Sequence, residues 1–488
     1  MVAQADGGSF GDRQPASWAT SGDAMGWRTS RQYCPPVHQP TSRLRRLFDE
    51  WRPSAITLGQ PAFPLAVLFG LNAVDELDRT AFAVLLPDIR DHFGLSDAAA
   101  LSLVAASTIA VLLIEVPLSF YCDRRNRVRI ATIGAATWAL FSIGTGLAVS
   151  VALLVAARIG AGAGRAVVNP THNSLLSDWY EPKARVKVFA VHRLANSVGQ
   201  IVGPAVAGLV AYLLGWRWPF FLFAVPTFVF VLLSLRLHEP VRGSHERRAA
   251  GADDAVADIE DLPERPWATM RVLARIPTFR RVWMAVPFLG IALFGIPNLL
   301  SLLYEDVFGL NAAARGIITA GIEPLQILGV IVSLPWVSRI AATRPSFLLR
   351  FVAYVGVVDG ILLVVLANAP NVAVAVGIHA LVAGSIGTLA PAFFAMTSLV
   401  APPRVRAAAF STMAVFAVPG IAVFLPVIGA LSDAYGIQAS MLMMVPVSLA
   451  AGFILSSARH TLEADIEAVR AESLARVVAD VPGGIDLP

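Results

Sequence analysis

Twelve apolar stretches divide most of this chain, and each is long enough to cross a lipid bilayer as a helix. Overall, 56% of the residues are hydrophobic and 15% are charged, whereas about a quarter of the residues in a soluble protein are charged. We therefore predict an all-α, multi-pass membrane protein. The predicted spans lie at residues 61–87, 98–121, 128–149, 151–178, 184–214, 217–236, 280–304, 314–338, 346–367, 371–399, 406–432 and 437–457.

Positively charged residues occupy alternate loops between these spans. Residues 122–129, residues 183–187 and the central segment 237–278 are rich in arginine and lysine, whereas each loop on the other side holds at most one arginine. Cytoplasmic loops of membrane proteins carry an excess of these residues. We therefore expect a protein of the cell membrane with both termini and the central segment in the cytoplasm.

The spans divide into two sets of six around the central segment. We expect a disordered cytoplasmic tail at residues 1–58, because it is rich in Ser, Gly, Pro and Gln. Near-helical spacing of apolar residues predicts an amphipathic surface helix in the last segment. The predicted organisation is a tail (1–58), an N-terminal six-helix bundle (59–236), a cytoplasmic linker (237–278), a C-terminal six-helix bundle (279–457) and an amphipathic helix with a tail (458–488).

An internal repeat relates the two sets. An offset of 221 residues links Pro170 to Pro391, and the same offset links Gly199 to Gly420. The fourth and fifth spans therefore recur as the tenth and eleventh. Two such pseudo-symmetric halves are the architecture of transporters that rock around a central site.

The fourth span carries polar residues well inside its ends: Arg158, Arg165, Asn169 and His172. Their spacings of seven, four and three residues predict one shared face of one helix. An arginine near the bilayer centre costs at least about 2.5 kcal/mol, so such a face needs water or opposite charge. We interpret it as a substrate path. The alternative is that the arginines only pair with carboxylates and hold the bundle together.

Other embedded polar groups extend this predicted substrate site. Arg193, Asn196 and Gln200 share one face of the fifth span, and His379 corresponds to Arg158 under the repeat. The predicted substrate-binding residues are Arg79, Arg158, Arg165, Asn169, His172, Arg193, Asn196, Gln200 and His379.

Three embedded carboxylates are predicted to couple transport to protons: Asp78, Glu115 and Glu323. Spacing in the first span puts Asp78 and Arg79 on one face with Asp75, while Glu76 points elsewhere. Burial raises and a nearby arginine lowers the pKa of a carboxyl group, and that balance suits proton coupling. The alternative is a permanent ion pair that locks helices together.

Several motifs resemble the major facilitator superfamily and its Spinster-like branch. The basic loop CDRRNRVR at 122–129 is similar to the superfamily signature after the second helix, and GQIVGPAVAG at 199–208 resembles a signature of the fifth. The stretch LNAVDELDRTAFAVLLPDI at 71–89 resembles the Spinster-like first helix. The resemblance implies the major facilitator fold and a proton-coupling role for Asp78. Arg165 departs from the branch, whose members carry a glutamate there.

The same basic loop is expected to act at the cytoplasmic mouth. Asp123, Arg124 and Arg127 lie in it, and we interpret them as a conformational latch rather than as a substrate site.

We therefore predict a secondary active transporter for a small or amphiphilic, anionic organic solute, coupled to protons or another cation. The alternatives are a hydrophobic-drug efflux antiporter and a non-transporting sensor or scaffold of the same fold. An enzyme is disfavoured, because no HExxH or GxSxG motif is present. We expect no metal, cofactor or nucleic acid, and a monomer in the lipid bilayer.

Overall fold

The computed structural model describes residues 52–122, 124–242, 266–402 and 406–480, and residues from Arg52 onward form one compact unit. The predicted tail up to residue 51 lies outside the described residues. The N-terminal half contains α2 (Pro53–Ile56), α3 (Phe63–Phe93), α4 (Asp97–Cys122), α5 (Arg127–Gly146), α6 (Val151–Arg165), α7 (Val168–Trp179), α8 (Pro182–Leu214) and α9 (Trp218–Ser234). The C-terminal half contains α12 (Pro266–Ala274), α13 (Pro277–Asp306), α14 (Ala312–Thr343), α15 (Ser346–Ala367), α16 (Val372–Val400), α17 (Arg406–Tyr435), α18 (Ile437–Leu442), α19 (Met444–Ser457) and α20 (Arg459–Asp480).

These helices account for the twelve predicted spans. Ten helical segments of the described residues are long and apolar enough to cross a membrane, and α9 is a shorter apolar helix. The twelfth is α3, whose 31 residues would extend about 46 Å at 1.5 Å per residue. Its charged residues lower its hydropathy without shortening it. The prediction of an all-α, multi-pass membrane protein is confirmed.

The fourth predicted span is not one continuous helix, so that expectation was wrong. The structure ends α6 at Arg165 and starts α7 at Val168. Pro170 has no N–H, so it cannot donate the helical hydrogen bond to the carbonyl of Ala166 four residues earlier. Arg158 and Arg165 therefore lie on α6 and His172 on α7, with different neighbours. The last predicted span breaks in the same way after Leu442, upstream of Pro446.

Polar side chains define where several helices begin. The side chain of Asn126 accepts a hydrogen bond of 2.8 Å from the Arg129 N–H at the start of α5. Ser150, Asn311 and Asn371 cap α6, α14 and α16 in the same way. Each cap satisfies a backbone N–H group that a helix start would otherwise leave without a partner.

The start of α3 is tied to the end of α7 by Tyr180. The Tyr180 hydroxyl accepts a hydrogen bond of 3.2 Å from the Leu65 N–H and donates one of 2.8 Å to the Pro61 carbonyl. Burial raises the pKa of Tyr180 to about 12, so the phenol keeps the proton that it donates. The short helix α2 lies within the stretch predicted as a tail, and its Ile56 packs into the buried cluster beside Leu68.

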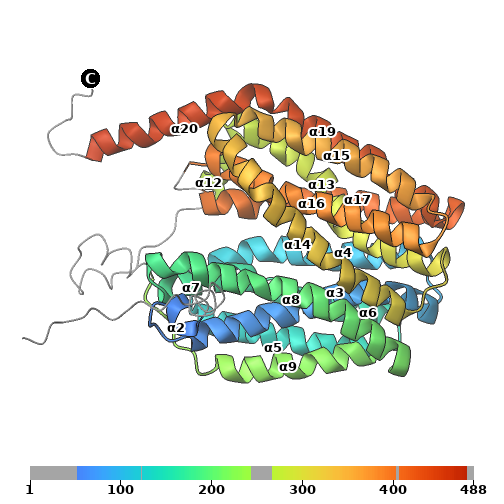
Figure 1. Ribbon diagram of the computed structural model, residues 1–488. Helices are drawn as coiled ribbons and strands as arrows, with labels where there is room; N and C mark the ends of the chain where they lie inside the picture. The colour runs from blue at the N-terminus through green and yellow to red at the C-terminus, as the bar shows by residue number, and fades with distance from the viewer. Residues whose placement is uncertain (1–51, 123, 243–265, 403–405, 481–488) are drawn as a thin grey trace, which may run out of the picture. The chain divides into compact units, whose positions relative to one another are not determined.

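The two halves meet through two equivalent helix pairs: α8 packs on α14, and α4 packs on α17 (Figure 1). Close backbone approach explains two glycines of these pairs. A Cβ atom on Gly208 would overlap the carbonyl oxygen of Ala312, and one on Gly429 would lie 2.5 Å from the Ala98 Cα. Small residues allow this approach inside membranes. Both contacts lie at the end where α3 stops and α4 starts, which we call the far end; the opposite end, near α12 and α20, is the linker end.

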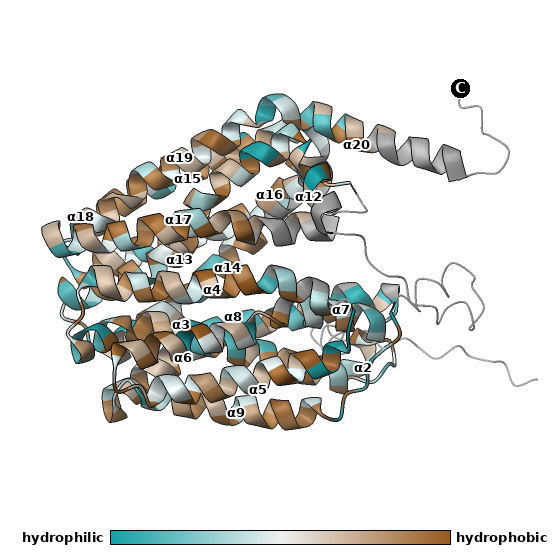
Figure 2. Ribbon diagram, turned by 180° about the vertical axis from the view of Figure 1, so that it is seen from behind, coloured by the Kyte–Doolittle hydropathy of each residue, from teal (hydrophilic) through white to brown (hydrophobic). Residues whose placement is uncertain are grey.

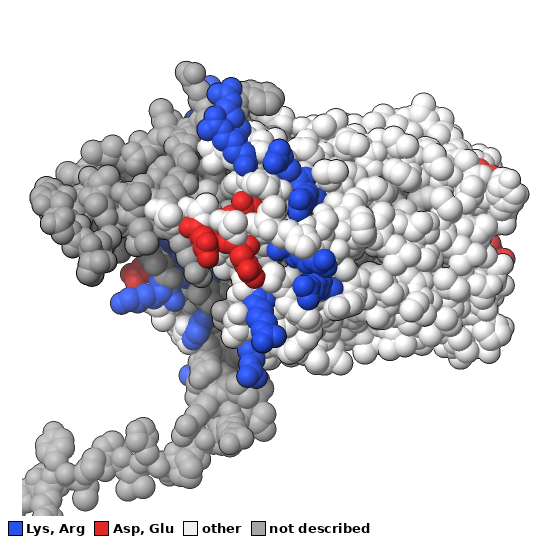
Figure 3. Space-filling model, turned by 90° about the horizontal axis from the view of Figure 1, so that it is seen from above, with Lys and Arg blue, Asp and Glu red and all other residues white. Residues whose placement is uncertain are grey.

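Charged residues lie near the ends of the described helices rather than along their outer faces. Hydrophobic residues dominate helices such as α9 in Figure 2, and hydrophilic residues gather around α7 and at the helix ends. Figure 3 shows Lys and Arg gathered toward one end of a face, with a wide area beyond them that carries no charged side chain. This distribution fits a band of lipid around the helices.

Candidate functional site

A chain of charges inside the N-terminal half is centred on Asp78 of α3. The Asp78 side chain is fully buried and accepts a hydrogen bond of 2.8 Å from the Ser142 hydroxyl of α5. Its other oxygen accepts one of 3.1 Å from Arg158 Nη1 of α6. Asp78 therefore connects three helices through one carboxylate.

Arg165 extends this chain to a second carboxylate. Its Nε forms an ion pair with Asp75 of α3, and its Nη1 lies 3.7 Å from the same Asp78 oxygen that Arg158 binds. Arg165 is held between two acids one turn apart on α3. We call Asp75, Asp78, Arg158 and Arg165 the charge chain; its two acids balance its two arginines.

Aromatic rings cover the guanidinium group of Arg158. Its Cζ lies 4.1 Å from the centre of the Phe82 ring and 5.9 Å from that of Phe220. A cation over an aromatic face is stabilised by the ring quadrupole, more strongly when water is excluded. Arg158 is 5% exposed, so this environment holds its charge inside the bundle.

A second ion pair lies on α3, and it corrects the expected faces of that helix. Arg79 donates a hydrogen bond of 3.0 Å from Nε to Glu76, not to Asp78. Gln200 of α8 donates one of 2.8 Å to the same Glu76 carboxylate. Arg79 and Glu76 therefore face α8, while Asp78 faces α6; the prediction that Arg79 shares a face with Asp78 was wrong. Residues three apart on a helix meet in this way.

Arg79 also faces the C-terminal half. Its side chain is 40% exposed, against 6% for Arg158 and 12% for Arg165. It interacts electrostatically with Glu323 of α14, which is half-buried. Of the three arginines, Arg79 is the one available to a solute between the halves.

The remaining predicted polar residues of the N-terminal half form a separate group on α7 and α8. His172 Nδ1 and His192 Nε2 lie 3.2 Å apart, and both side chains are buried. Asn196 accepts a hydrogen bond of 2.7 Å from Asn72 of α3. Arg193 is exposed, and the side chain of Asn169 lies outside those described.

Two polar groups in the C-terminal half pair with neutral partners. The His379 Nδ1 atom lies 3.0 Å from the hydroxyl of Tyr304, which joins α16 to α13. His379 corresponds to Arg158 in the repeat, so the bond between the first and fourth spans recurs without a formal charge pair. Ser385 donates to the buried Asp359.

The predicted latch residues lie at the linker end. Arg127 is 1% exposed and donates to Glu239 at 2.7 Å and to the Ser174 hydroxyl at 2.6 Å. It also pairs with Asp178 of α7. Arg127 thus ties α5, α7 and the end of α9 within one half. Arg124 is exposed, and Asp123 lies outside the described residues.

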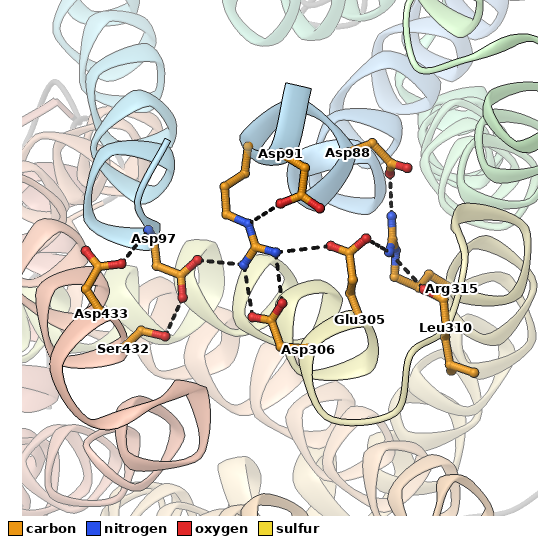
Figure 4. Close-up of polar contacts among 10 residues, drawn as sticks. Asp88, Asp91, Asp97, Glu305, Asp306, Leu310, Arg315, Ser432 and Asp433 are labelled. Atoms are coloured by element: carbon orange, nitrogen blue, oxygen red, sulfur yellow. Dashed lines mark hydrogen bonds and ion pairs between the residues drawn. The ribbon is translucent and has the colours of Figure 1, made fainter. Parts of the chain in front are cut away.

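A network that sequence reasoning did not predict joins the halves at the far end (Figure 4). Arg90 of α3 binds both oxygens of Asp306 of α13, at 2.8 and 2.9 Å. Arg315 of α14 pairs with Asp88 of α3 and lies 2.8 Å from Glu305. A sequence signal was present for Arg90, which lies between Asp88 and Asp91 at the end of an apolar span. The nearest acids to Arg315 along the chain, in contrast, are Asp306 and Glu323.

A carboxylate from the other side completes this network. Asp433 of α17 accepts hydrogen bonds of 2.7 and 3.0 Å from the Asp97 and Ala98 N–H groups, which caps α4 (Figure 4). Ser432 donates to Asp97 at 2.5 Å, and Asp97 in turn binds Arg90 at 2.8 Å. We call these contacts the far-end clamp.

Neither network forms a metal site. Among the described residues, no group of three or more His, Cys, Asp or Glu side chains could hold a metal ion. Glu115, which was predicted to couple transport to protons, is half-buried on α4. The charge chain and the far-end clamp are suited to binding ions and moving charge within the bundle.

Comparison with known families agrees with this architecture. The profile of the Major Facilitator Superfamily matches residues 68–417. The chain belongs to the major facilitator superfamily. This is a family of transporters and not of enzymes, and the predicted fold is confirmed with it.

Individual relatives confirm the Spinster-like resemblance. The chain is 29% identical over 236 residues to "Protein spinster homolog 1" of Homo sapiens, covering 47% of this chain and 43% of the relative. It is 27% identical over 153 residues to "Probable L-galactonate transporter" of Escherichia coli K12, covering 31% of this chain and 34% of the relative. The alignments therefore span less than half the length of these curated relatives.

Solved structures share the fold. A crystal structure of a bacterial homolog to the human lysosomal transporter Spinster, in an inward-facing and unoccupied conformation, matches with a TM-score of 0.70. The sequences are 19% identical, and the match covers 83% of this chain and 98% of that chain.

Proposed function

We propose that this protein is a secondary active transporter that couples proton movement to the passage of an amphiphilic organic anion. The observation that carries the proposal is the charge chain: two acids and two arginines held within the membrane-spanning part of one half. Embedded ionisable groups are costly in a bilayer and mark ion or substrate pathways.

Asp78 is the proposed coupling group. Its negative charge is shared between Arg158 and Arg165, at 3.1 and 3.7 Å. A proton on Asp78 would cancel that charge and weaken the hold of α3 on α6. Because the same carboxylate also accepts from Ser142, one protonation event would loosen α3 from both α5 and α6. Coupling of proton binding to transport requires that the proton stabilise one helix arrangement more than the other.

Arg79 is the proposed first contact of the substrate anion. Arg79 is more exposed than Arg158 and Arg165. Its position is fixed by Glu76, which Gln200 also binds. Glu323 approaches from the other half, so an incoming anion would compete with Glu323 for Arg79. A proton on Glu323 would remove that competition. This makes Glu323 the proposed second proton acceptor.

Movement between two states is proposed to occur by rocking of the halves. The far-end clamp joins the halves at one end, through Arg90 and Asp306 and through Arg315 and Asp88. We place the linker end in the cytoplasm, because the loops there are rich in Lys and Arg. The described arrangement is then closed toward the outside, and breaking the clamp would open that side.

Reconstitution tests this proposal. The purified protein is first screened by thermal shift against lysophospholipids, long-chain fatty acids, aromatic acids and cationic dyes. Stabilising compounds are then offered to proteoliposomes with and without a pH gradient. The proposal predicts uphill accumulation of an anion that collapses when the gradient is dissipated. Gradient-driven movement of dyes alone would favour a drug antiporter, and binding without flux would favour a sensor.

A further inference from the structure

The junction of α14 and α15 carries three exposed arginines at the linker end. Arg339 lies near the end of α14, Arg344 follows it, and Arg350 lies near the start of α15. None of their side chains bonds to a residue that the structure describes. Residues 324–358 contain no Asp, Glu or Lys, so neither helix offers a counter-charge through this region.

An aromatic cluster lies beside these arginines. The Trp336 ring of α14 packs edge-on against Phe351 of α15 at 4.8 Å and against Phe347 at 6.4 Å. Tyr354 extends the cluster, 6.5 Å from Phe347. Trp336 is 47% exposed and Tyr354 is 59% exposed, so the cluster faces outward rather than filling the core.

The arginines and the aromatic rings share one surface. Residues 347, 350, 351 and 354 follow the three- and four-residue spacing that defines one face of α15. Arg339 lies three residues after Trp336, one turn nearer the linker end of α14. Further along both helices the surface is apolar and exposed, with Ile331 and Val332 on α14 and Val358 and Ile361 on α15. The surface thus changes from charged to aromatic to aliphatic along α14, and along α15 Arg350 lies between Phe347 and Phe351 before the aliphatic part.

We propose that this junction is a binding site for an anionic phospholipid. The guanidinium groups of Arg339, Arg344 and Arg350 would hold the phosphate, because guanidinium forks match phosphate oxygens in pairs. The aromatic rings would lie at the level of the glycerol backbone, where amphipathic rings gather in membranes. The acyl chains would lie along the aliphatic surface of α14 and α15. Orientation by positive loops needs only Lys and Arg residues in the loop, and does not require an arginine within α15 on the aromatic face.

The site differs from other positive patches at the linker end. Arg271, Arg275 and Arg280 are also exposed there, on α12, in the loop after it and on α13. None of these three arginines lies on the aromatic face of α14 and α15. They provide a control with the same change of charge in the same half of the protein.

The test uses the full-length protein purified in detergent. Native mass spectrometry measures retention of phosphatidylglycerol against phosphatidylcholine with the same acyl chains, for the wild type, for R339Q/R344Q/R350Q and for R271Q/R275Q/R280Q. We expect preferential retention of phosphatidylglycerol by the wild type and the control. In the first triple variant, affinity should fall by about fivefold for each arginine removed. Equal losses in both triple variants would overturn the proposal, since they would indicate general charge attraction.

Two further measurements separate a lipid from a free anion. Inorganic phosphate should not raise the melting temperature of the wild type at concentrations where phosphatidylglycerol does; equal stabilisation would contradict a lipid site. Trp336→Ala combined with Tyr354→Ala should weaken phosphatidylglycerol retention while all three arginines remain. Unchanged retention in that variant would show that the aromatic rings do not contribute to lipid binding.

Discussion

Asp78 and Arg158 form a buried ion pair, 3.1 Å apart, between α3 and α6. The second oxygen of Asp78 accepts from Ser142, and Arg165 approaches from the same side as Arg158. Every described contact of this carboxylate depends on its negative charge or on its acceptor capacity. A single proton would therefore change the contacts between α3 and two neighbouring helices.

Replacing Asp78 with Asn should uncouple transport. The amide keeps the size of the side chain but carries no charge and binds no proton, so the two arginines would lose their shared partner. We expect proton-driven accumulation to vanish while exchange of substrate across the membrane continues. Flux in proteoliposomes with an imposed pH gradient measures both.

Asp91→Asn is the matched control for that change. Asp91 lies on the same helix, and its side chain is 60% exposed in its pair with Arg90. Exposed pairs contribute only about 0–1 kcal/mol, so accumulation should persist in this variant. Uphill transport that survives Asp78→Asn as well would remove Asp78 from the coupling mechanism.

Arg158 and Arg79 should respond differently to replacement by Gln. Arg158 is buried beside Asp78, and removing one partner of a buried pair costs about 3–5 kcal/mol. Arg158→Gln should therefore lower expression and melting temperature. Arg79→Gln leaves the buried Glu76 carboxylate without its cation but still bonded to Gln200, so it should lower both by less than Arg158→Gln does and raise the half-saturation concentration for the anion. The two variants are scored by fluorescence-detected size exclusion and by flux.

If Arg79→Gln transports with wild-type affinity, Arg79 is not a substrate ligand. If Arg158→Gln is as stable as the wild type, the pair with Asp78 contributes little to folding. The first result would remove the proposed substrate role of Arg79, and the second would remove the proposed structural role of Arg158.

Exchanging the charges of Asp75 and Arg165 should restore the thermal stability that a single charge reversal removes. Arg165→Glu would put three acids close together on α3 and α6, and we expect loss of stable protein. Adding Asp75→Arg supplies a cation opposite the new glutamate. Thermal stability should then recover by more than the error of the measurement; no recovery would mean that the two side chains do not interact through charge.

Weakening the far-end clamp should open the far side. Arg90 contacts Glu305 and Asp306 of the other half, so Arg90→Gln removes both of these contacts between the halves at once. Spin labels on the far ends of α9 and α18 report the distance between the halves. We expect the longer-distance population to grow in Arg90→Gln and to stay at the wild-type level in Arg217→Gln, a control at the same end. An unchanged distribution in Arg90→Gln would show that the clamp does not hold that side closed.

The sequence allowed the fold to be predicted because bilayer-length apolar spans, alternating positive loops and an internal repeat can all be recognised along the chain without knowing which side chains meet. It also located the residues of the charge chain. Their pairing could not be predicted, because residues such as Asp78 and Arg158 are 80 positions apart and meet only through helix packing. Helical periodicity even suggested the wrong partner for Arg79, since Arg79 and Asp78 are neighbours in sequence and yet face different helices.

The far-end clamp illustrates a second limit. Arg90 and Arg315 lie in loops poor in positive charge, and each binds an acid of the other half as well as acids of its own half. The break after Arg165 had a visible cause in Pro170, but a proline inside a membrane helix can also bend it without ending it. Only the packed arrangement distinguishes these outcomes.

Proton movement driven by the anion is the most direct test of the central claim. Proteoliposomes loaded with a pH-sensitive dye receive the anion identified by the screen, with no imposed gradient. We expect a change in internal pH that requires the anion, occurs with the control Asp91→Asn and is absent with Asp78→Asn. Anion uptake by the wild type with no change in internal pH would contradict it.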